Sequence, residues 1–196
     1  TKPMPTRPRY FWNDGVNPSA PLQAVGKRYR ESYFEHYPGL WRHGDWIRFS
    51  RNDACVIFGR SDTTINRHGI RMGTAEIYRV VEDLPEVVDS LVVDLEYLGR
   101  ASYMPLFVVL RAGMDLDAAL KARIKDRIRS AASARHVPDE IYAIHEVPRT
   151  LTGKKMELPV RKLRLGMPLD NVASADAMAN PASLNWFVAL AGTLRL

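Results

Sequence analysis

The segment TAEIYRVVEDLPEVVDSLVVDL, residues 74–95, contains a helical pattern followed at once by a strand pattern. Apolar side chains recur at the i, i+3, i+4 and i+7 positions of a helix that lies on a sheet: Ile77, Val80, Val81 and Leu84. Thr74 is a candidate N-cap, and Glu76 stands in the first turn, where the helix dipole favours a negative charge. The β-rich residues 90–95 predict a strand directly after this helix.

Comparable patterns lie on both sides of this segment. In chain order they are 29–36 (helix), 46–50 and 54–58 (hairpin), 106–111 (strand), 116–131 (helix), 141–147 (strand) and 157–165 (helix). Strands that alternate with helices on one sheet indicate a mixed α and β fold, written α/β (α+β) because the sheet is expected to be mixed. We expect a small lobe with a mixed sheet of about three strands packed by helices, preceded by a β-rich segment.

The composition excludes several classes of protein. The chain has 196 residues, of which 46% are hydrophobic, so it can bury a sizeable core. Its longest nearly unbroken apolar run, 104–110, is far shorter than the ~20 residues of a membrane span. No charged and then apolar leader opens the chain, and its single cysteine, Cys55, stands in a run that predicts a buried strand position. We therefore expect a cytoplasmic protein without a membrane span.

The net charge of +6 is unevenly distributed. Residues 76–96 contain seven acids and one arginine, whereas residues 121–135 contain six bases and one acid. Such sorting is typical of solvated helix faces, the interpretation we favour, or of a surface for an anionic ligand or a nucleic acid. The bases within 121–129 occupy every second position, which spreads them around a helix, and no aromatic residues alternate with them. A nucleic-acid partner is therefore not expected.

One segment rich in glycine and arginine carries a chemical signal. GRSDTTINRHGIRMGTAEIY, residues 59–78, places three glycines and three arginines between a predicted strand and a predicted helix. Gly69 and Gly73 permit backbone conformations or close approaches that a Cβ would forbid. Arginines in such a loop can donate to phosphate oxygens, although Arg60 could simply pair with Asp62 across a turn.

A second segment, VPRTLTGKKMEL at 147–158, presents two lysines after a Thr-Gly turn. An exposed basic turn is the simpler interpretation of this segment alone. It is not a phosphate-binding P-loop, because Pro148 and Lys155 stand where that motif needs Gly and Ser or Thr. The five histidines show no metal-ligand spacing, so no metal site is expected in this chain.

The order and spacing of three segments add a further signal: WRHGDW at 41–46, the glycine- and arginine-rich 59–78, and PRTLTGK at 148–154. Together they resemble the C-terminal third of the adenylate-forming acyl-CoA synthetase family. Members of this family activate a carboxylic acid with ATP to an acyl-adenylate and then pass the acyl group to a thiol. Local sequence such as PRYFWNDG and SARHVPDEIY is similar to members that act on acetoacetate, with acetate and propionate as the alternatives.

The resemblance also implies a domain organisation. Residues 1–61 would be the end of the large N-terminal adenylation domain, residues 62–165 the small mobile C-terminal domain, and residues 166–196 a tail with a docking helix. The rest of the large domain, with its phosphate loop, acyl pocket and magnesium-binding acid, would be the partner of this chain, which alone is expected to be inactive. ATP, CoA and Mg²⁺ are the implied cofactors. The alternative is a stand-alone module that binds CoA or an acidic partner.

The resemblance assigns roles to residues of the adenylation step. By this resemblance Lys154 would be the catalytic cation, which bonds the substrate carboxylate and the bridging region of the adenylate, and Lys155 is the less favoured candidate. Asp45 would accept hydrogen bonds from the ribose hydroxyls. Arg60 would reach the ribose or the phosphates, and Arg71 would lie near the nucleotide phosphates.

Three more residues receive roles in the thioester-forming step. Asp62 occupies the hinge position, where the small domain rotates between its two poses; Thr63 follows it where many relatives have a second acid. Gly69 would line the pantetheine tunnel, where a side chain would block the thiol. Arg129 would meet the nucleotide end of CoA.

Overall fold

The computed structural model describes residues 8, 10–15, 26–61, 64–67, 70–95 and 102–193, without the side chains of 58, 59, 70, 71 and 191–193. The chain divides into two compact units, Thr1–Gly44 and Asp45–Leu196. The predicted domain boundary between 61 and 62 falls at the edge of the described residues, so it stays a prediction.

The first unit is organised around a short helix, α1 (Lys27–Tyr33), whose Tyr29 is fully buried. The carboxylate of Asp14 accepts hydrogen bonds from the backbone N–H groups of Arg28 and Tyr29, at 2.9 and 2.8 Å, and so satisfies two donors of the first turn. A Cβ at Gly26 would lie 2.1 Å from the Asp14 carboxylate, so only glycine fits beside it. Tyr29 also belongs to a cluster of aromatic rings: Phe11, Tyr29, Tyr33, Phe34 and Trp41.

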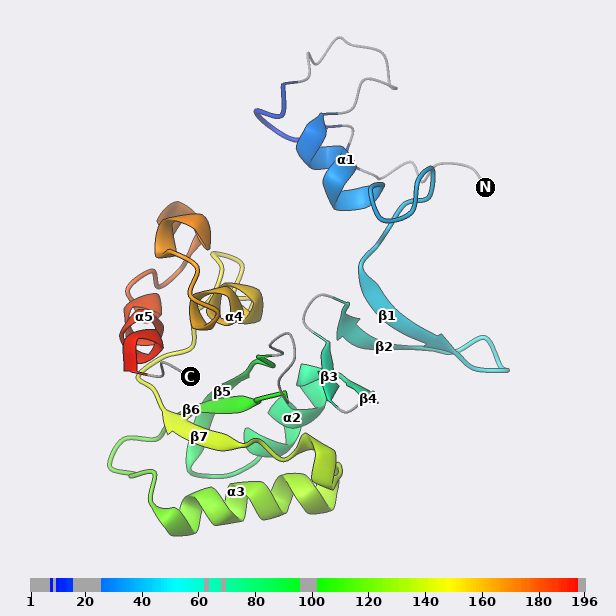
Figure 1. Ribbon diagram of the computed structural model, residues 1–196. Coiled ribbons are helices and arrows are strands. Elements are labelled where there is room, and N and C mark those ends of the chain that lie inside the picture. Colours follow the sequence, from blue (N-terminus) through cyan, green and yellow to red (C-terminus); the bar gives the residue numbers. More distant parts are fainter. Residues whose placement is uncertain are drawn as a thin grey trace. The chain divides into compact units, whose positions relative to one another are not determined.

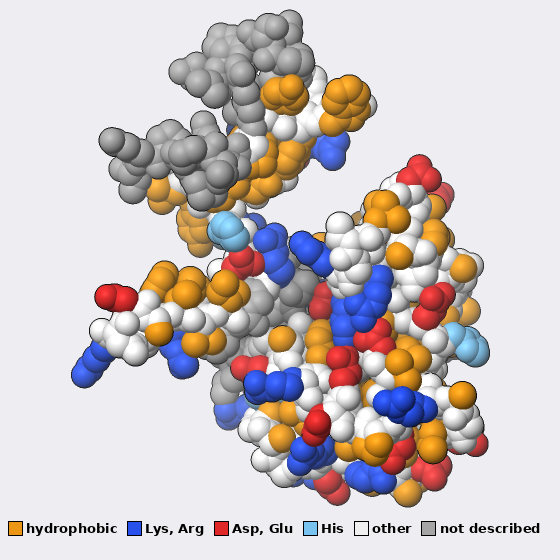
Figure 2. Space-filling view, turned by 180° about the vertical axis from the view of Figure 1, so that it is seen from behind, with side chains coloured by type: hydrophobic (Ala, Val, Ile, Leu, Met, Phe, Trp, Pro, Cys, Tyr) orange, Lys and Arg blue, Asp and Glu red, His pale blue; other side chains and the backbone are white. Residues whose placement is uncertain are grey.

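Two antiparallel hairpins open the second unit. Strand β1 (Asp45–Phe49) pairs with β2 (Cys55–Arg60), and β3 (Ile65–Arg67) pairs with β4 (Ile70–Met72). The β1–β2 hairpin carries exposed apolar side chains, with Phe49 70% and Ile57 63% exposed (Figure 2). Cys55 is exposed as well, so the expectation of a buried strand position is wrong. The apolar run therefore predicts the strand correctly, but it does not predict whether other parts of the protein cover the strand.

The main layer is a mixed sheet of three strands, β5 (Val87–Val92), β6 (Pro105–Leu110) and β7 (Glu140–Ala143), in that order. β5 and β6 are antiparallel, and β6 and β7 are parallel, which confirms the predicted fold class. Helix α3 (Ala118–Ala131) and the 3₁₀ helix η1 (Ala134–His136) form the crossover between the two parallel strands.

Side chains that alternate along the central strand feed two separate cores. Leu106 and Val108 join one cluster with helices α2 (Thr74–Val81) and α3. Phe107 points the other way and joins a second cluster with α4 (Glu157–Arg164) and α5 (Ser183–Thr193). Figure 1 shows α3 on one side of the sheet and α4 and α5 on the other. The sheet is therefore buried on both faces.

The remaining elements lie in the C-terminal part of the chain. They are the 3₁₀ helices η2 (Leu169–Asn171) and η3 (Ala175–Ala177), which connect α4 to α5. In the described part of the chain, the helices are too short or too polar to cross a membrane.

The helix starts differ from the sequence expectation at one position. Gly73, and not Thr74, is the N-cap of α2, and no side chain caps that end. The Thr74 hydroxyl lies 3.4 Å from the Glu157 carboxylate of α4 instead. In α3, the carboxylate of Asp117 accepts a hydrogen bond of 2.7 Å from the backbone N–H of Leu120 and caps the helix directly.

Four of the five basic residues of α3 pair with neighbouring acids. Lys121 pairs with Glu140 at 2.8 Å and Arg127 with Asp83 at 3.0 Å. The other bases between 121 and 129 are engaged too: Arg123 with Glu86, Arg129 with Asp126, and Lys125 with the Asp139 carbonyl. Acids of the segment 76–96 thus meet bases of the segment 121–135, and the charge sorting has a structural role.

Replacement of the α3 cap tests this account of the crossover helix. Asp117→Ala is expected to lower the free energy of unfolding by about 1 kcal/mol, because the first turn loses an acceptor for the Leu120 N–H. Urea unfolding followed by circular dichroism measures the loss. Asp115→Ala, two residues earlier and exposed, is the matched control and should leave the midpoint unchanged. Equal effects of the two substitutions would contradict the capping role.

Candidate active site

The predicted catalytic lysine lies on a tight turn between β7 and α4. The Thr150 N–H donates to the Lys154 carbonyl at 2.9 Å, and the Gly153 N–H donates to the Thr150 carbonyl at 2.8 Å. The Lys154 N–H donates to the Thr150 hydroxyl oxygen at 3.1 Å. Gly153 has φ +81°, a left-handed conformation that glycine adopts without strain. The backbone around Lys154 is therefore fixed by local hydrogen bonds.

The two neighbouring lysines have opposite environments. Lys154 is exposed, and no hydrogen bond or ion pair engages its ammonium within the described residues. The Lys155 ammonium lies 2.5 Å from the Glu82 carboxylate and 2.8 Å from the Asp89 carboxylate. It also donates to the Ser90 carbonyl at 2.6 Å and lies 3.9 Å from the centroid of the Tyr78 ring. Lys155 is a structural cation, so the geometry supports Lys154 as the one that meets a ligand.

Two groups beside Lys155 have shifted pKa values that favour ionised Asp89 and protonated Tyr78. Burial raises the pKa of Asp89, but hydrogen bonds from Lys155 and Arg149 outweigh it and hold that pKa below its usual value. Burial and the nearby charge of Glu157 raise the pKa of Tyr78 well above its usual value. The Tyr78 hydroxyl donates to the Glu157 carboxylate at 3.0 Å and so links α2 to α4.

Two of the predicted nucleotide-binding residues lie together. Asp45 and Arg60 are cross-strand partners at the open end of the β1–β2 hairpin, and their charged groups are 3.5 Å apart. The Arg60 side chain is 58% exposed and that of Asp45 is 20% exposed. A carboxylate acceptor beside an exposed guanidinium suits a ligand that carries both hydroxyls and phosphates. The alternative pairing of Arg60 with Asp62 involves a residue outside the described part of the chain.

The other predicted site residues are less informative. Asp62 and Gly69 lie outside the described residues, and Arg71 is a β4 residue opposite Asn66 whose side chain is not described. Arg129 lies in the last turn of α3 and pairs with Asp126. It belongs to the helix on one face of the sheet, whereas the Lys154 turn precedes the helix on the other face.

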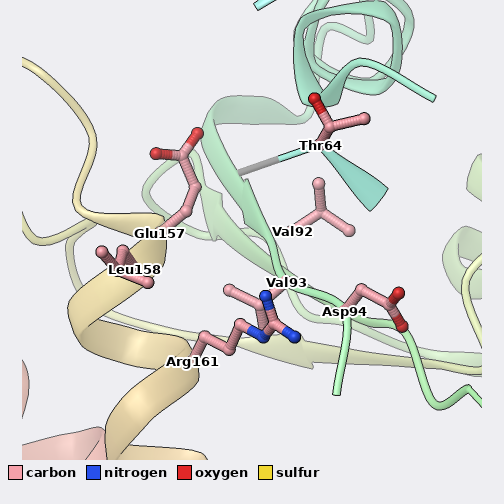
Figure 3. Close-up of a pocket in the computed structure, with 7 residues that line it drawn as sticks. All are labelled: Thr64, Val92, Val93, Asp94, Glu157, Leu158 and Arg161. Carbon is pink, nitrogen blue, oxygen red and sulfur yellow. The ribbon is translucent and has the colours of Figure 1, made fainter. Parts of the chain in front are cut away.

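The pocket shown in Figure 3 lies between α4 and the end of β5. It is lined by Thr64, Val92, Val93, Asp94, Glu157, Leu158 and Arg161. Its volume of about 10 Å³ is room for about one water molecule, so it is not a substrate pocket. Sequence reasoning gave no signal for it, because its residues come from three distant segments. Lys154 does not line this pocket, so the candidate site is a surface that presents Lys154.

Comparisons with known proteins show which proteins this chain is similar to. The solved acetoacetyl-CoA synthetase from Streptomyces lividans superimposes with a TM-score of 0.84 and 46% identity, over 97% of this chain and 27% of that one. The acetoacetyl-coenzyme A synthetase of Rhizobium meliloti is 42% identical over 97% of this chain. That of Caenorhabditis elegans is 39% identical over 95% of it. The chain is similar to the C-terminal part of acetoacetyl-CoA synthetases.

This similarity to acetoacetyl-CoA synthetases confirms the resemblance inferred from the three sequence segments. The chain spans about a quarter of the length of these relatives, 27% of the Rhizobium protein and 25% of the Caenorhabditis protein. A solved anthranilate CoA ligase, AuaEII, shares the fold over 75% of the chain, with a TM-score of 0.58 and 22% identity. No family model matches the chain.

The charge cluster around Asp89 predicts a pH-dependent contribution to stability. Asp89→Asn is expected to lower the free energy of unfolding by about 1–3 kcal/mol at pH 7, because Lys155 and Arg149 lose a charged acceptor. Since the pKa of Asp89 is lower in the folded chain, its contribution is complete above the unfolded value of about 3.9 and is lost as pH falls through the folded value.

Urea unfolding of both proteins between neutral and acidic pH measures this contribution. The two unfolding free energies should converge at the acidic end of the series. Asp83→Asn, which breaks the exposed pair with Arg127, should cost less than about 1 kcal/mol at pH 7. A difference between wild type and Asp89→Asn that is independent of pH would contradict the assignment.

Proposed function

We propose that this chain is the C-terminal part of an ATP-dependent acid–thiol ligase. The ligase converts acetoacetate, ATP and CoA to acetoacetyl-CoA, AMP and pyrophosphate through an acyl-adenylate. The observation that carries the proposal is the similarity to acetoacetyl-CoA synthetases over 95–97% of the chain. The exposed Lys154 on its fixed turn supports the proposal.

The domain organisation is part of the proposal. Residues 1–61 complete a large adenylation domain, residues 62–165 form the small mobile domain, and residues 166–196 dock on it. The rest of the large domain is the partner on which catalysis depends, and the chain alone is inactive. The predicted location in the cytoplasm stays a prediction.

Adenylation brings two anions together. The substrate carboxylate attacks the α-phosphate of ATP, and their repulsion must be screened while the new bond forms. A compact ammonium on a flexible stem provides this screening in a site from which water is excluded. Lys154 holds such a group on a turn whose backbone is already ordered, so the backbone loses little further entropy when the group is placed.

The nucleotide would be bound partly by the β1–β2 hairpin. Asp45 would accept hydrogen bonds from the ribose hydroxyls, and Arg60 would donate to the ribose or the phosphates. Arg71 would act near the phosphates. These roles agree with the acceptor and donor that Asp45 and Arg60 present together.

Rotation of the small domain would separate the two half-reactions. Asp62 would be the hinge, and rotation would withdraw Lys154 and bring Gly69 to the pantetheine tunnel. Arg129 would meet the nucleotide end of CoA. Because Arg129 pairs with the exposed Asp126, CoA binding would have to compete with that pair.

Magnesium is expected to bind elsewhere in the ligase. Within the described residues, no group of three or more His, Cys, Asp or Glu side chains could hold a metal ion. These residues do not fit a magnesium site. Its ligand would lie in the rest of the large domain.

The role of Lys154 is tested in the complete ligase. Lys154→Ala should lower acetoacetate-dependent ATP–pyrophosphate exchange at least about 100-fold, because the cation that stabilises the adenylation transition state is lost. Thioester formation from supplied acetoacetyl-adenylate should be unchanged. Lys125→Ala on α3 is the control and should retain both activities.

Exchange that survives Lys154→Ala would show that the lysine assignment is wrong. Exchange supported by acetate or propionate, and not by acetoacetate, would instead overturn the proposed substrate.

The role of Asp45 is tested by a matched pair of substitutions in the same hairpin. Asp45→Asn should raise the KM for ATP about 10-fold, because the neutral amide accepts hydrogen bonds from hydroxyls more weakly than a carboxylate does. Asp53→Asn, in the turn at the other end of the hairpin, should leave the KM unchanged. Its φ of +59° suits Asn as well as Asp. An equal KM in both variants would remove Asp45 from the site.

A further inference from the structure

We propose that Asp89 is a positioning residue for Lys154, because its single carboxylate holds the chain on both sides of that lysine. This inference rests on the proposed role of Lys154 in adenylation. It assigns a function to an acidic residue on the sheet, 65 positions before the lysine in the sequence.

The first connection follows Lys154 in the chain. One carboxylate oxygen of Asp89 lies 2.8 Å from the ammonium of Lys155, the next residue. The same ammonium donates to Glu82 at the end of α2 and to the Ser90 carbonyl on β5. The Lys155 side chain is only 15% exposed, so solvent screens these charges less than surface charges.

The second connection precedes Lys154. The other carboxylate oxygen of Asp89 accepts a hydrogen bond of 2.6 Å from one terminal nitrogen of Arg149. The other terminal nitrogen of Arg149 donates to the Gly153 carbonyl, also at 2.6 Å. Through the planar guanidinium, Asp89 therefore fixes the peptide unit directly before Lys154.

An irregularity in β5 accompanies this geometry. The register between β5 and β6 shifts between Val87 and Asp89, so the strand bulges where the carboxylate is needed. A bulge is a common way to redirect a side chain beside a functional site. The Ser90 N–H donates, at 2.9 Å, to the Asp89 oxygen that contacts Lys155 and fixes the carboxylate further.

The result is a held backbone with an exposed side chain. Residues 153 and 155 are connected to Asp89, whereas the side chain of Lys154 extends from the turn into solvent. Catalysis by a positioned charge is sensitive to displacements of about 1 Å, which can cost about 100-fold in rate. The carboxylate should therefore affect the half-reaction that uses Lys154 and leave the other one intact.

The experiment measures the two half-reactions separately in the complete ligase. Asp89→Asn should lower ATP–pyrophosphate exchange about 10- to 100-fold and leave thioester formation from supplied acetoacetyl-adenylate unchanged. Asp83→Asn, which breaks the pair with Arg127 on α3, is the matched control and should retain both rates.

A second pair of variants tests the same contact from the other partner. Lys155→Met should lower ATP–pyrophosphate exchange as Asp89→Asn does. Lys155→Arg, which keeps the positive charge, should retain most of the wild-type rate. Amide hydrogen exchange in the 196-residue chain gives a readout independent of catalysis. The amides of Gly153 and Lys154, which are hydrogen-bonded in the turn, should exchange faster in Asp89→Asn and Lys155→Met than in wild type. If Asp89→Asn does not fold, the two Lys155 variants still decide the matter.

The outcomes separate this inference from the proposed function. One outcome is loss of ATP–pyrophosphate exchange in Lys154→Ala with normal ATP–pyrophosphate exchange in both Asp89→Asn and Lys155→Met. It would overturn the positioning role and leave the proposed function intact. Equal losses in both half-reactions would also overturn it, because they would indicate a general structural defect. Normal exchange in Lys154→Ala would overturn both.

Discussion

The structure of the second unit depends on burial of one short strand from both sides. β6 alternates its side chains between two clusters, and each cluster recruits a different pair of helices. The Lys154 turn lies between β7 and α4, and its Asp89 contact lies on β5. The position of the turn is therefore set by a sheet that cannot shift without opening one of the two cores. The ammonium of Lys154 is thus attached, through a flexible side chain, to a turn that the sheet holds in place.

Polar contacts extend this rigidity from the core to the surface. Lys155 joins the turn to α2 and β5, and Tyr78 joins α2 to α4 through Glu157. The turn also pairs with the C-terminal segment: the Leu151 N–H donates to the Ala177 carbonyl at 3.1 Å. Residues after α4 therefore help to hold the turn, which gives the tail a role in shaping the candidate site.

Local patterns in the sequence predicted most of the fold. The apolar spacing in 74–84 corresponds to α2, and the runs at 90–95 and 106–111 correspond to β5 and β6 within a few residues. Such patterns reflect the geometry of a single helix or strand, so they are visible in a single sequence. The same reasoning failed for Cys55, because exposure depends on what covers a strand. It failed for Thr74, whose hydroxyl faces a carboxylate 83 positions away.

The candidate site was predictable only as a set of segments. Lys154, Asp45 and Arg60 were found through motif order, but the pairing of Asp45 with Arg60 follows from hairpin register. The partners of Lys155 lie 65 to 77 positions away in the sequence, so no local pattern could identify them. The sorted charges of 76–96 and 121–135 were visible in the sequence, yet only the fold shows that they meet.

The exposed β1–β2 hairpin has a thermodynamic consequence. A two-stranded ribbon is marginally stable in water, and this one leaves Phe49 and Ile57 mostly uncovered. Any surface that covered these side chains would therefore add free energy that favours the paired strands. Salts that strengthen apolar burial should favour both the covering of these side chains and the pairing of the two strands. The same contact would stabilise the pair of Asp45 and Arg60 that already stands at the end of the ribbon.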